Sequence, residues 1–198
     1  MNERFFDLTK SKQDRIINGA LSVFAENGFS HASTDEITGR AGISKGLLFH
    51  YFGSKLGTYT FLYDYSARYI LLALKNEFKD KETDFFRLHR RLVRVEAMIL
   101  KTYPCMLLFS SQAELERDPG VTEALKPLRG KVLLAYQNLY EQVRIPNSFQ
   151  AEDPGRLSLM LTFCKSGVMQ GFLRFGQSYE DQYLETMDSF IDTLENNR

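Results

Sequence analysis

The sequence has little cysteine, no tryptophan and no surplus of charge of either sign. Its 198 residues include two cysteines, and 25 Lys and Arg balance 25 Asp and Glu, so the formal net charge is zero. Non-specific binding to nucleic acid or to an anionic membrane needs surplus basic side chains, so the composition argues against both. Cys105 and Cys164 stand outside any Cys-x-x-Cys or Cys/His cluster, and we expect two buried thiols, no metal and no cofactor.

Long apolar runs are missing as well. The best short runs, residues 69–74 and 105–109, fall far below the roughly 18 residues that a membrane-spanning helix requires. The N-terminus mixes charge with its apolar residues and has no apolar signal-peptide core. These absences predict a soluble, cytoplasmic protein without membrane contact.

Motifs of common enzyme classes are absent too. The sequence has no nucleophile elbow, phosphate-binding loop, zinc-protease motif or dinucleotide-binding glycine motif. Its three histidines, His31, His50 and His89, form no local ligand or triad pattern. We therefore predict that the protein is not an enzyme.

Helical spacing dominates what is present. Apolar residues recur at intervals of three and four along nearly the whole chain, and almost none alternate with a period of two. This pattern predicts an all-α fold. Breaks are expected at residues 103–104, 118–120, 145–154 and 176–178, which gives roughly nine helices.

The chain should divide near residue 55. A first helix should begin after Ser11 and stop at Asn27-Gly28, and a long helix should begin after Ser54. No flexible linker follows Ser54, so the boundary falls inside that long helix. We expect an N-terminal module over residues 1–55 and a larger helical domain over residues 56–198.

Two short helices lie inside the N-terminal module. Ser33 should cap the first, which ends before Gly42, and Ser44 should cap the second, which runs to Phe52. Two short helices joined by a glycine-containing turn, behind a longer first helix, describe a helix-turn-helix, and the second would be the recognition helix.

The recognition helix should have two different faces. At 100° per residue, Leu48 and Phe52 point inward toward Ile37 and Phe24, while Gly46, Leu47 and His50 point outward. Glycine in so short a helix costs about 1 kcal/mol relative to alanine, unless another backbone must approach closely. A DNA phosphate would be such a neighbour.

Phosphate donors surround this helix. Ser44 and the free amides of the helix start can bind a phosphate oxygen, and Lys45, Lys55 and the Tyr51 hydroxyl can add contacts. Taken singly, Lys45 and Lys55 are equally well ordinary surface lysines, and Phe49 equally well a core residue. Their agreement in one segment favours nucleic-acid binding.

These residues resemble a known family. The stretch is similar to the DNA-binding domain of TetR-family transcriptional regulators over Arg15-Ile16-Ile17, Ala20-Leu21, Phe24, Gly28-Phe29, Thr34, Ile37, Ala41-Gly42-Ile43-Ser44-Lys45-Gly46, Phe49, Tyr51-Phe52 and Ser54-Lys55. The resemblance implies a homodimeric, usually repressive regulator that binds a palindromic double-stranded operator and leaves it when a small molecule enters the C-terminal domain. The DNA contacts it implies are Thr34, Ser44, Lys45, Gly46, Leu47, Phe49, His50, Tyr51 and Lys55.

Three residues depart from the family pattern, and one of them, Thr38 in place of a frequent Ala, should matter little for the structure. Leu47 stands where Thr or Ser is frequent, so an apolar contact, for instance with a thymine methyl, would replace a hydrogen bond. Gly57 stands where an acidic residue is frequent, which should weaken the first helical turn after Lys55.

The C-terminal helices carry the expected dimer interface. The segment 157–175 is apolar on more than one face, and Gly167 and Gly171 would permit close helix approach. The resemblance implies that the last two helices of each subunit form a four-helix bundle. The predicted interface residues are Leu157, Met160, Leu161, Cys164, Val168, Phe190, Ile191 and Leu194.

An effector pocket is harder to locate from sequence. Candidate lining residues are Phe61, Met98, Phe109, Gln112, Tyr136, Tyr140 and Phe163. Such aromatic and methionine stripes are equally well plain core. A pocket built from them would favour a small apolar or aromatic effector with few polar anchors.

A different class of function remains open. The helix-turn-helix could bind a protein partner, with the dimer acting as an adaptor. Residues 1–55 hold seven basic and six acidic side chains, an excess of one positive charge. If the module binds DNA, its affinity should therefore come from a few well-placed donors on each of two subunits.

Overall fold

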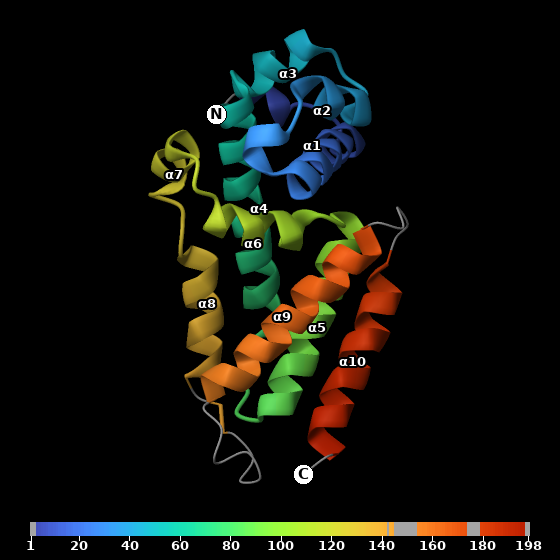
Figure 1. Cartoon of the computed structure of the whole chain (residues 1–198), viewed down its shortest axis with the longest axis vertical. Helices are drawn as coiled ribbons and strands as arrows, with labels where there is room; N and C mark the ends of the chain where they lie inside the picture. Colours follow the sequence, from blue (N-terminus) through green and yellow to red (C-terminus); the bar gives the residue numbers. More distant parts are fainter. Residues whose placement is uncertain (1–2, 142, 145–153, 174–178, 197–198) are drawn as a thin grey trace. The chain divides into compact units, whose positions relative to one another are not determined.

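The protein is built of helices. The computed structural model describes residues 3–141, 143–144, 154–173 and 179–196, without the side chains of residues 3, 154–158 and 173. Within these ranges no strand forms, as the sequence predicts (Figure 1). The elements are the 3-10 turn η1 (Glu3–Phe5) and the helices α1 (Lys10–His31), α2 (Thr34–Ala41), α3 (Lys45–Phe52), α4 (Lys55–Glu77), α5 (Phe85–Thr102), α6 (Met106–Leu115), α7 (Pro119–Leu125), α8 (Lys131–Tyr140), α9 (Pro154–Leu173) and α10 (Glu180–Asn196).

The backbone packs as two compact units. The first comprises residues 1–69 and 102–131, and the second residues 70–101 and 132–198. The first unit therefore contains α1, α2 and α3 together with α6 and α7, and α4 continues from the first unit into the second. The functional boundary expected near residue 55 stays a prediction.

Helix α1 differs from its prediction at both ends. It begins at Lys10, after a Thr9 that makes no side-chain cap, rather than after Ser11. The expected stop at Gly28 is a kink (φ 67°, ψ −179°), beyond which the helix resumes to His31. The residue after the kink is held by tertiary contacts, because the Phe29 ring lies 5.3 Å from the Tyr59 ring and its amide donates to Glu116 Oε2 at 3.3 Å.

The two short helices form as predicted. Ser33 caps α2 by accepting a hydrogen bond from the Asp35 amide at 3.2 Å, and Gly42 ends α2 in the left-handed conformation. Ser44 caps α3 by accepting from the Leu47 amide, also at 3.2 Å. Each cap satisfies an amide that the first helical turn leaves without a partner.

The start of α4 corrects the expectation for Gly57. Helix α4 begins at Lys55, and Ser54 Oγ accepts from the Gly57 amide at 2.9 Å. A Cβ at position 57 would lie 1.9 Å from the Phe52 carbonyl oxygen. Glycine is required there because the end of α3 packs directly on the first turn of α4.

The core of the first unit lies between α1, α2 and α3. Leu21, Ile37 and Leu48 are fully buried in it. The expectation for Phe52 was partly wrong, because this side chain is half-buried and its ring lies 5.2 Å from Phe5 and 4.8 Å from Phe61. The N-terminal turn η1 thus covers the end of the recognition helix.

The second unit is arranged around α5. This helix buries one long apolar face, including Leu92, Val95 and Ile99. Arg90 on α5 forms ion pairs with Asp192 at 2.6 Å and Glu195 at 2.5 Å on α10. Among the residues that the structure describes, no helix is both long and apolar enough to span a membrane.

The contact between α1 and α2 gives a first prediction. A Cβ at Gly19 would lie 2.7 Å from the amide nitrogen and 2.9 Å from the Cα of Ala41. Gly19→Ala should therefore force the two helices apart and lower the free energy of unfolding by about 1–2 kcal/mol, despite its gain in helix propensity. Urea unfolding measures the change.

Gly39→Ala is the matched control for this variant. Gly39 also lies within a helix, but nothing approaches its Cβ position within 4 Å. This substitution should stabilise the protein by up to about 1 kcal/mol. Equal effects of the two variants would contradict the close approach at Gly19.

Candidate nucleic-acid interface

The outward face of α3 is open to solvent. Gly46, Phe49 and His50 are exposed, with 37% of Phe49 accessible, so Phe49 is not a core residue of this chain. The atom nearest to a Cβ at Gly46 is Ser44 Oγ, 4.0 Å away. Nothing inside the chain therefore requires glycine at position 46, and the space beside it is available to an external backbone.

The two flanking lysines already have partners within the chain. Lys45 Nζ lies 2.9 Å from Asp35 Oδ1, in an exposed ion pair. Lys55 Nζ donates to the Ser30 carbonyl oxygen at 3.2 Å and lies 4.7 Å from the centre of the Phe29 ring. A phosphate would have to exchange with these partners.

The other expected DNA contacts vary in exposure. Ser44 is exposed, and while its Oγ accepts from Leu47, its O–H remains able to donate to a phosphate. Thr34, at the start of α2, and Leu47 are half-buried. Tyr51 is only 9% exposed, and its ring lies 5.7 Å from the ring of Phe5, so little of this residue is open to a DNA contact.

An open groove adjoins the recognition helix within the first unit. It has a volume of about 770 Å³ and runs from Phe49 and His50 along the first half of α4, with Ala124 and Leu128 on the opposite wall. Among the expected effector contacts, only Phe61 lines it. No sequence pattern indicated this groove, because α7 supplies its far wall.

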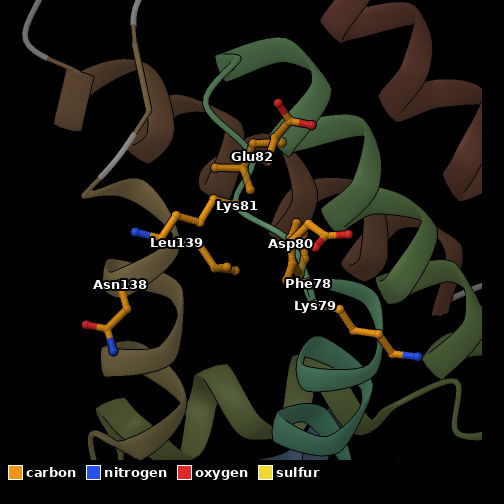
Figure 2. A pocket seen from close by; sticks show the side chains of 8 residues that line it. Phe78, Lys79, Asp80, Lys81, Glu82, Asn138 and Leu139 are labelled. Carbon is orange, nitrogen blue, oxygen red and sulfur yellow. The ribbon is translucent and has the colours of Figure 1, made fainter.

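A smaller pocket lies in the second unit. It measures about 120 Å³ and is bounded by the loop after α4 and by α8 (Figure 2). Its lining is mostly charged or polar and includes none of the expected effector contacts: Phe78, Lys79, Asp80, Lys81, Glu82, Leu88, Asn138 and Leu139.

The expected effector contacts are divided between the units. Phe61, Phe109 and Gln112 belong to the first unit, where Phe109 is a fully buried core residue against Tyr59. The other four belong to the second unit: Met98, Tyr136, Tyr140 and Phe163. Met98 and Phe163 are exposed by 57% and 66%. A single pocket made of all seven stays a prediction.

A buried polar cluster in the second unit escaped the sequence analysis. Glu96 Oε1 accepts from Lys165 Nζ at 2.9 Å and from the Tyr136 hydroxyl at 3.4 Å, while Oε2 accepts from the Tyr183 hydroxyl at 2.6 Å. Glu96 follows Leu92 by four residues and lies on the same buried face of α5. A charged residue at an apolar position of the helical pattern could therefore have indicated this cluster from sequence.

A second buried polar side chain, His89, lies seven residues before Glu96 on the same helix. It is 1% exposed, and its Nε2 lies 3.4 Å from the Tyr140 hydroxyl. Its Nδ1 has no hydrogen-bond partner within the described residues. Burial, with a smaller effect of the Lys165 charge, lowers the pKa of His89 to about 3, so the imidazole is neutral at pH 7.

The expected dimer residues separate into an outer and an inner set. On the outside, Met160 and Phe190 are 56% and 40% exposed, and Cys164 is exposed. Val168 and Leu194 are half-buried. On the inside, Leu161 and Ile191 are buried within the unit. The Leu157 side chain lies outside the described residues.

The two cysteines also differ from each other. Cys105 is buried as expected, and burial raises the pKa of its thiol to about 12. The expectation of a buried Cys164 was wrong for this chain, because Cys164 lies on the exposed face of α9 near Met160. That face carries apolar side chains without cover from the chain itself.

Comparison with known proteins supports the helix-turn-helix. The family model described as "Bacterial regulatory proteins, tetR family" matches residues 16–57, which run from α1 into the start of α4. The TetC protein of transposon Tn10 from Escherichia coli is 39% identical over 46 residues, which is 23% of this chain and 23% of TetC. The similarity to this relative thus spans about a quarter of its length.

Solved structures share the fold over nearly the whole chain. A TetR-like regulator from Rhodococcus sp. RHA1 is 15% identical, with a TM-score of 0.55, over 96% of this chain and all of that chain. A TetR-family regulator from Chloroflexus aurantiacus is 21% identical, with a TM-score of 0.54, over 99% and 97% of the two chains. FadR from Bacillus subtilis, in complex with stearoyl-CoA, is 16% identical, with a TM-score of 0.51, over 88% and 97%.

The two kinds of comparison agree. The family model covers α2, α3 and parts of α1 and α4. The solved structures share the fold over the remaining helices as well. With both in place, residues 16–57 are similar to the tetR family of bacterial regulatory proteins, and the chain shares the fold of solved structures described as members of that family.

Proposed function

We propose that the protein is a homodimeric repressor that binds a palindromic operator through α3 and leaves it when a small effector binds. The observation that carries this proposal is the open outward face of α3, with a glycine at position 46 that nothing inside the chain requires. A regulator of this kind acts where the DNA is, in the cytoplasm, and performs no catalysis.

Helix α3 would enter the major groove. Leu47, Phe49 and His50 would face base edges, and the amides at the start of α3 would bind a phosphate together with Ser44. Lys45 would break its ion pair with Asp35 and form one with a phosphate instead. The binding surface therefore favours correctly spaced phosphates over diffuse attraction to any polyanion.

The dimer would be formed by α9 and α10. Met160 and Cys164 on α9 and Phe190 on α10 are exposed apolar side chains that a second copy would cover. Two-fold symmetry would present two α3 helices to half-sites that lie about 34 Å apart or at a multiple of that distance. One subunit contributes few cations, so both half-sites are needed for tight binding.

Effector binding is assigned to the second unit. Its buried polar cluster around Glu96 provides hydrogen-bonding groups inside a helical domain. FadR, a structural neighbour, is itself in complex with stearoyl-CoA, which supports ligand binding by this fold. The effector would favour the chain conformation whose two α3 helices no longer match the operator.

The first test is sequence-specific binding to DNA. We expect the protein to retard a fragment from upstream of its own gene and to protect a palindrome within it, because the two α3 helices of a dimer read equivalent half-sites. A mobility-shift assay with excess unrelated DNA, followed by footprinting, measures this. Absence of any specific retardation, with a protein partner that survives nuclease treatment in a pull-down, would favour an adaptor instead.

Removing the partner of Lys45 should strengthen DNA binding. Asp35→Asn frees Lys45 and removes an exposed carboxylate beside the proposed phosphate site. We expect operator affinity to rise by about threefold to tenfold at low salt, with a smaller gain as salt increases. Fluorescence anisotropy at several salt concentrations measures the effect.

Glu185→Gln is the charge-matched control for Asp35→Asn. Glu185 is exposed on α10 and belongs to the second unit, whereas α3 belongs to the first. It should leave operator affinity unchanged. If both variants gain equally, the effect comes from overall charge, and the role of Asp35 is refuted.

A charge on the exposed face of α9 should separate the subunits. Met160→Glu places a carboxylate on the surface that the second copy would bury, and burying an unpaired charge is strongly unfavourable. We expect a monomer in light scattering and a loss of at least about tenfold in operator affinity.

Leu115→Glu serves as the control for Met160→Glu. Leu115 is 78% exposed at the end of α6, outside the proposed interface. This variant should keep the dimer mass and the operator affinity. A Met160→Glu protein that stays dimeric would refute the assignment of the interface to this face.

A further inference from the structure

Four helices of the second unit bring polar groups to one buried point. Helix α5 supplies Glu96, α8 supplies Tyr136, α9 supplies Lys165 and α10 supplies Tyr183. Glu96 and Lys165 are only 5% and 8% exposed. A buried ion pair adds little net stability, because desolvation offsets the attraction, and apolar side chains would fill the same space as well. Stability alone therefore does not account for this pair.

The hydrogen bonds at this point leave donors in excess. Both oxygens of Glu96 are occupied, one by Lys165 and Tyr136 and the other by Tyr183. The Lys165 ammonium has three N–H groups, and within the described residues one of them has an acceptor, Glu96 Oε1. The ion pair can therefore still donate hydrogen bonds, through Lys165, but has no free carboxylate oxygen to accept one.

His89 provides a further donor. A phenol donates more readily than it accepts, so we assign the hydrogen of Tyr140 to the contact with His89 Nε2. The neutral imidazole then carries its single hydrogen on Nδ1, the atom without a partner in the described part of the chain. His89 lies two helical turns before Glu96 on α5, so both side chains are on the same buried face of this helix.

We propose that these groups bind the carboxylate of the effector, which is a small organic acid with an apolar body. We call them the Glu96 cluster and define it as Glu96, Lys165, His89, Tyr136, Tyr140 and Tyr183. Lys165 Nζ and His89 Nδ1 each donate to the incoming carboxylate, while Glu96 keeps Lys165 in place. This inference rests on the proposed function and names the chemical class of its effector.

The other charge classes fit the cluster less well. An ammonium ligand would need a free acceptor, and both Glu96 oxygens are occupied. Asp188 on α10 does have a buried Oδ1 without a partner among the described residues, but it lies five residues from Tyr183. At 100° per residue this puts Asp188 on another face of α10.

Of the helices around the Glu96 cluster, α8 is the one that a ligand could displace most easily. Its Tyr136 and Tyr140 are only half-buried, and Leu133 and Leu134 are each 57% exposed. A ligand can reach the cluster by displacing α8 at a smaller loss of buried apolar area than any displacement of α5 would cause. The Phe85 ring, 4.5 Å from the ring of His89, and the apolar side chains of α8 would then contact its body.

The test compares acids with their uncharged analogues. The full-length protein, without DNA, is titrated by calorimetry with phenylacetate and with decanoate, and then with phenylacetamide and decanamide. Because charge-assisted hydrogen bonds exceed neutral ones in strength, we expect at least one acid to bind at least about tenfold more tightly than its amide. If neither acid is preferred, or if phenethylamine is bound best, the proposal is wrong.

Variants of the Glu96 cluster test whether its residues cause the preference for acid over amide. The double substitution Glu96→Gln with Lys165→Met keeps the cluster neutral and should abolish the preference for acid over amide. Arg90→Gln changes another cation of α5, one that pairs with Asp192 and Glu195 near the surface, and should keep it. A preference that survives in the double variant, or is lost in Arg90→Gln, would overturn the assignment.

A second variant keeps the test valid if the double variant does not fold. His89→Phe removes one donor while retaining an aromatic ring in the buried position, and should reduce the preference severalfold. An unchanged preference would refute the role of His89 Nδ1. Since these titrations contain no DNA, failure of operator binding would not affect them, and an acid that binds without releasing operator would refute only its role as effector.

Discussion

The position of the recognition helix depends on one close approach of backbone to backbone. The Phe52 carbonyl oxygen at the end of α3 occupies the space that a Cβ of Gly57 would need, in the first turn of α4. Ser54, between them, caps that turn through the Gly57 amide. With no side chain intervening, α3 has little freedom to tilt against α4. Because α4 continues into the second unit, its first turn is where a change in α4 would reach α3.

Local signals in the sequence were sufficient for the helix-turn-helix. The caps at Ser33 and Ser44 act between residues at most three apart, so the sequence alone predicted them correctly, together with the end of α2 before Gly42. The kink at Gly28 was placed correctly but interpreted as a helix end. Contacts of Phe29 with Tyr59 and Glu116, up to 87 residues away, decide that the chain resumes its helix there.

The sequence predicted only part of the candidate site, because tertiary contacts determine the rest. The lysines beside α3 could be named from their spacing, but not their partners Asp35 and Ser30, which tertiary packing brings to them. The pair of Glu96 and Lys165 joins residues 69 apart on two helices, and each reads alone as an ordinary surface charge. Likewise, Cys164 follows an apolar stripe that turned out to face outward.

Two ion pairs in this protein, one exposed and one buried, bear on the proposed function. At α3 an exposed acid, Asp35, neutralises Lys45, so a phosphate gains a cation only by taking it from another anion. Inside the second unit Glu96 neutralises Lys165, and desolvation makes that pair costly to separate. A ligand that binds beside such a pair would use its spare donors without separating it. In both places the proposed specificity would follow from replacing a partner or completing a hydrogen-bond set, which long-range attraction could not provide.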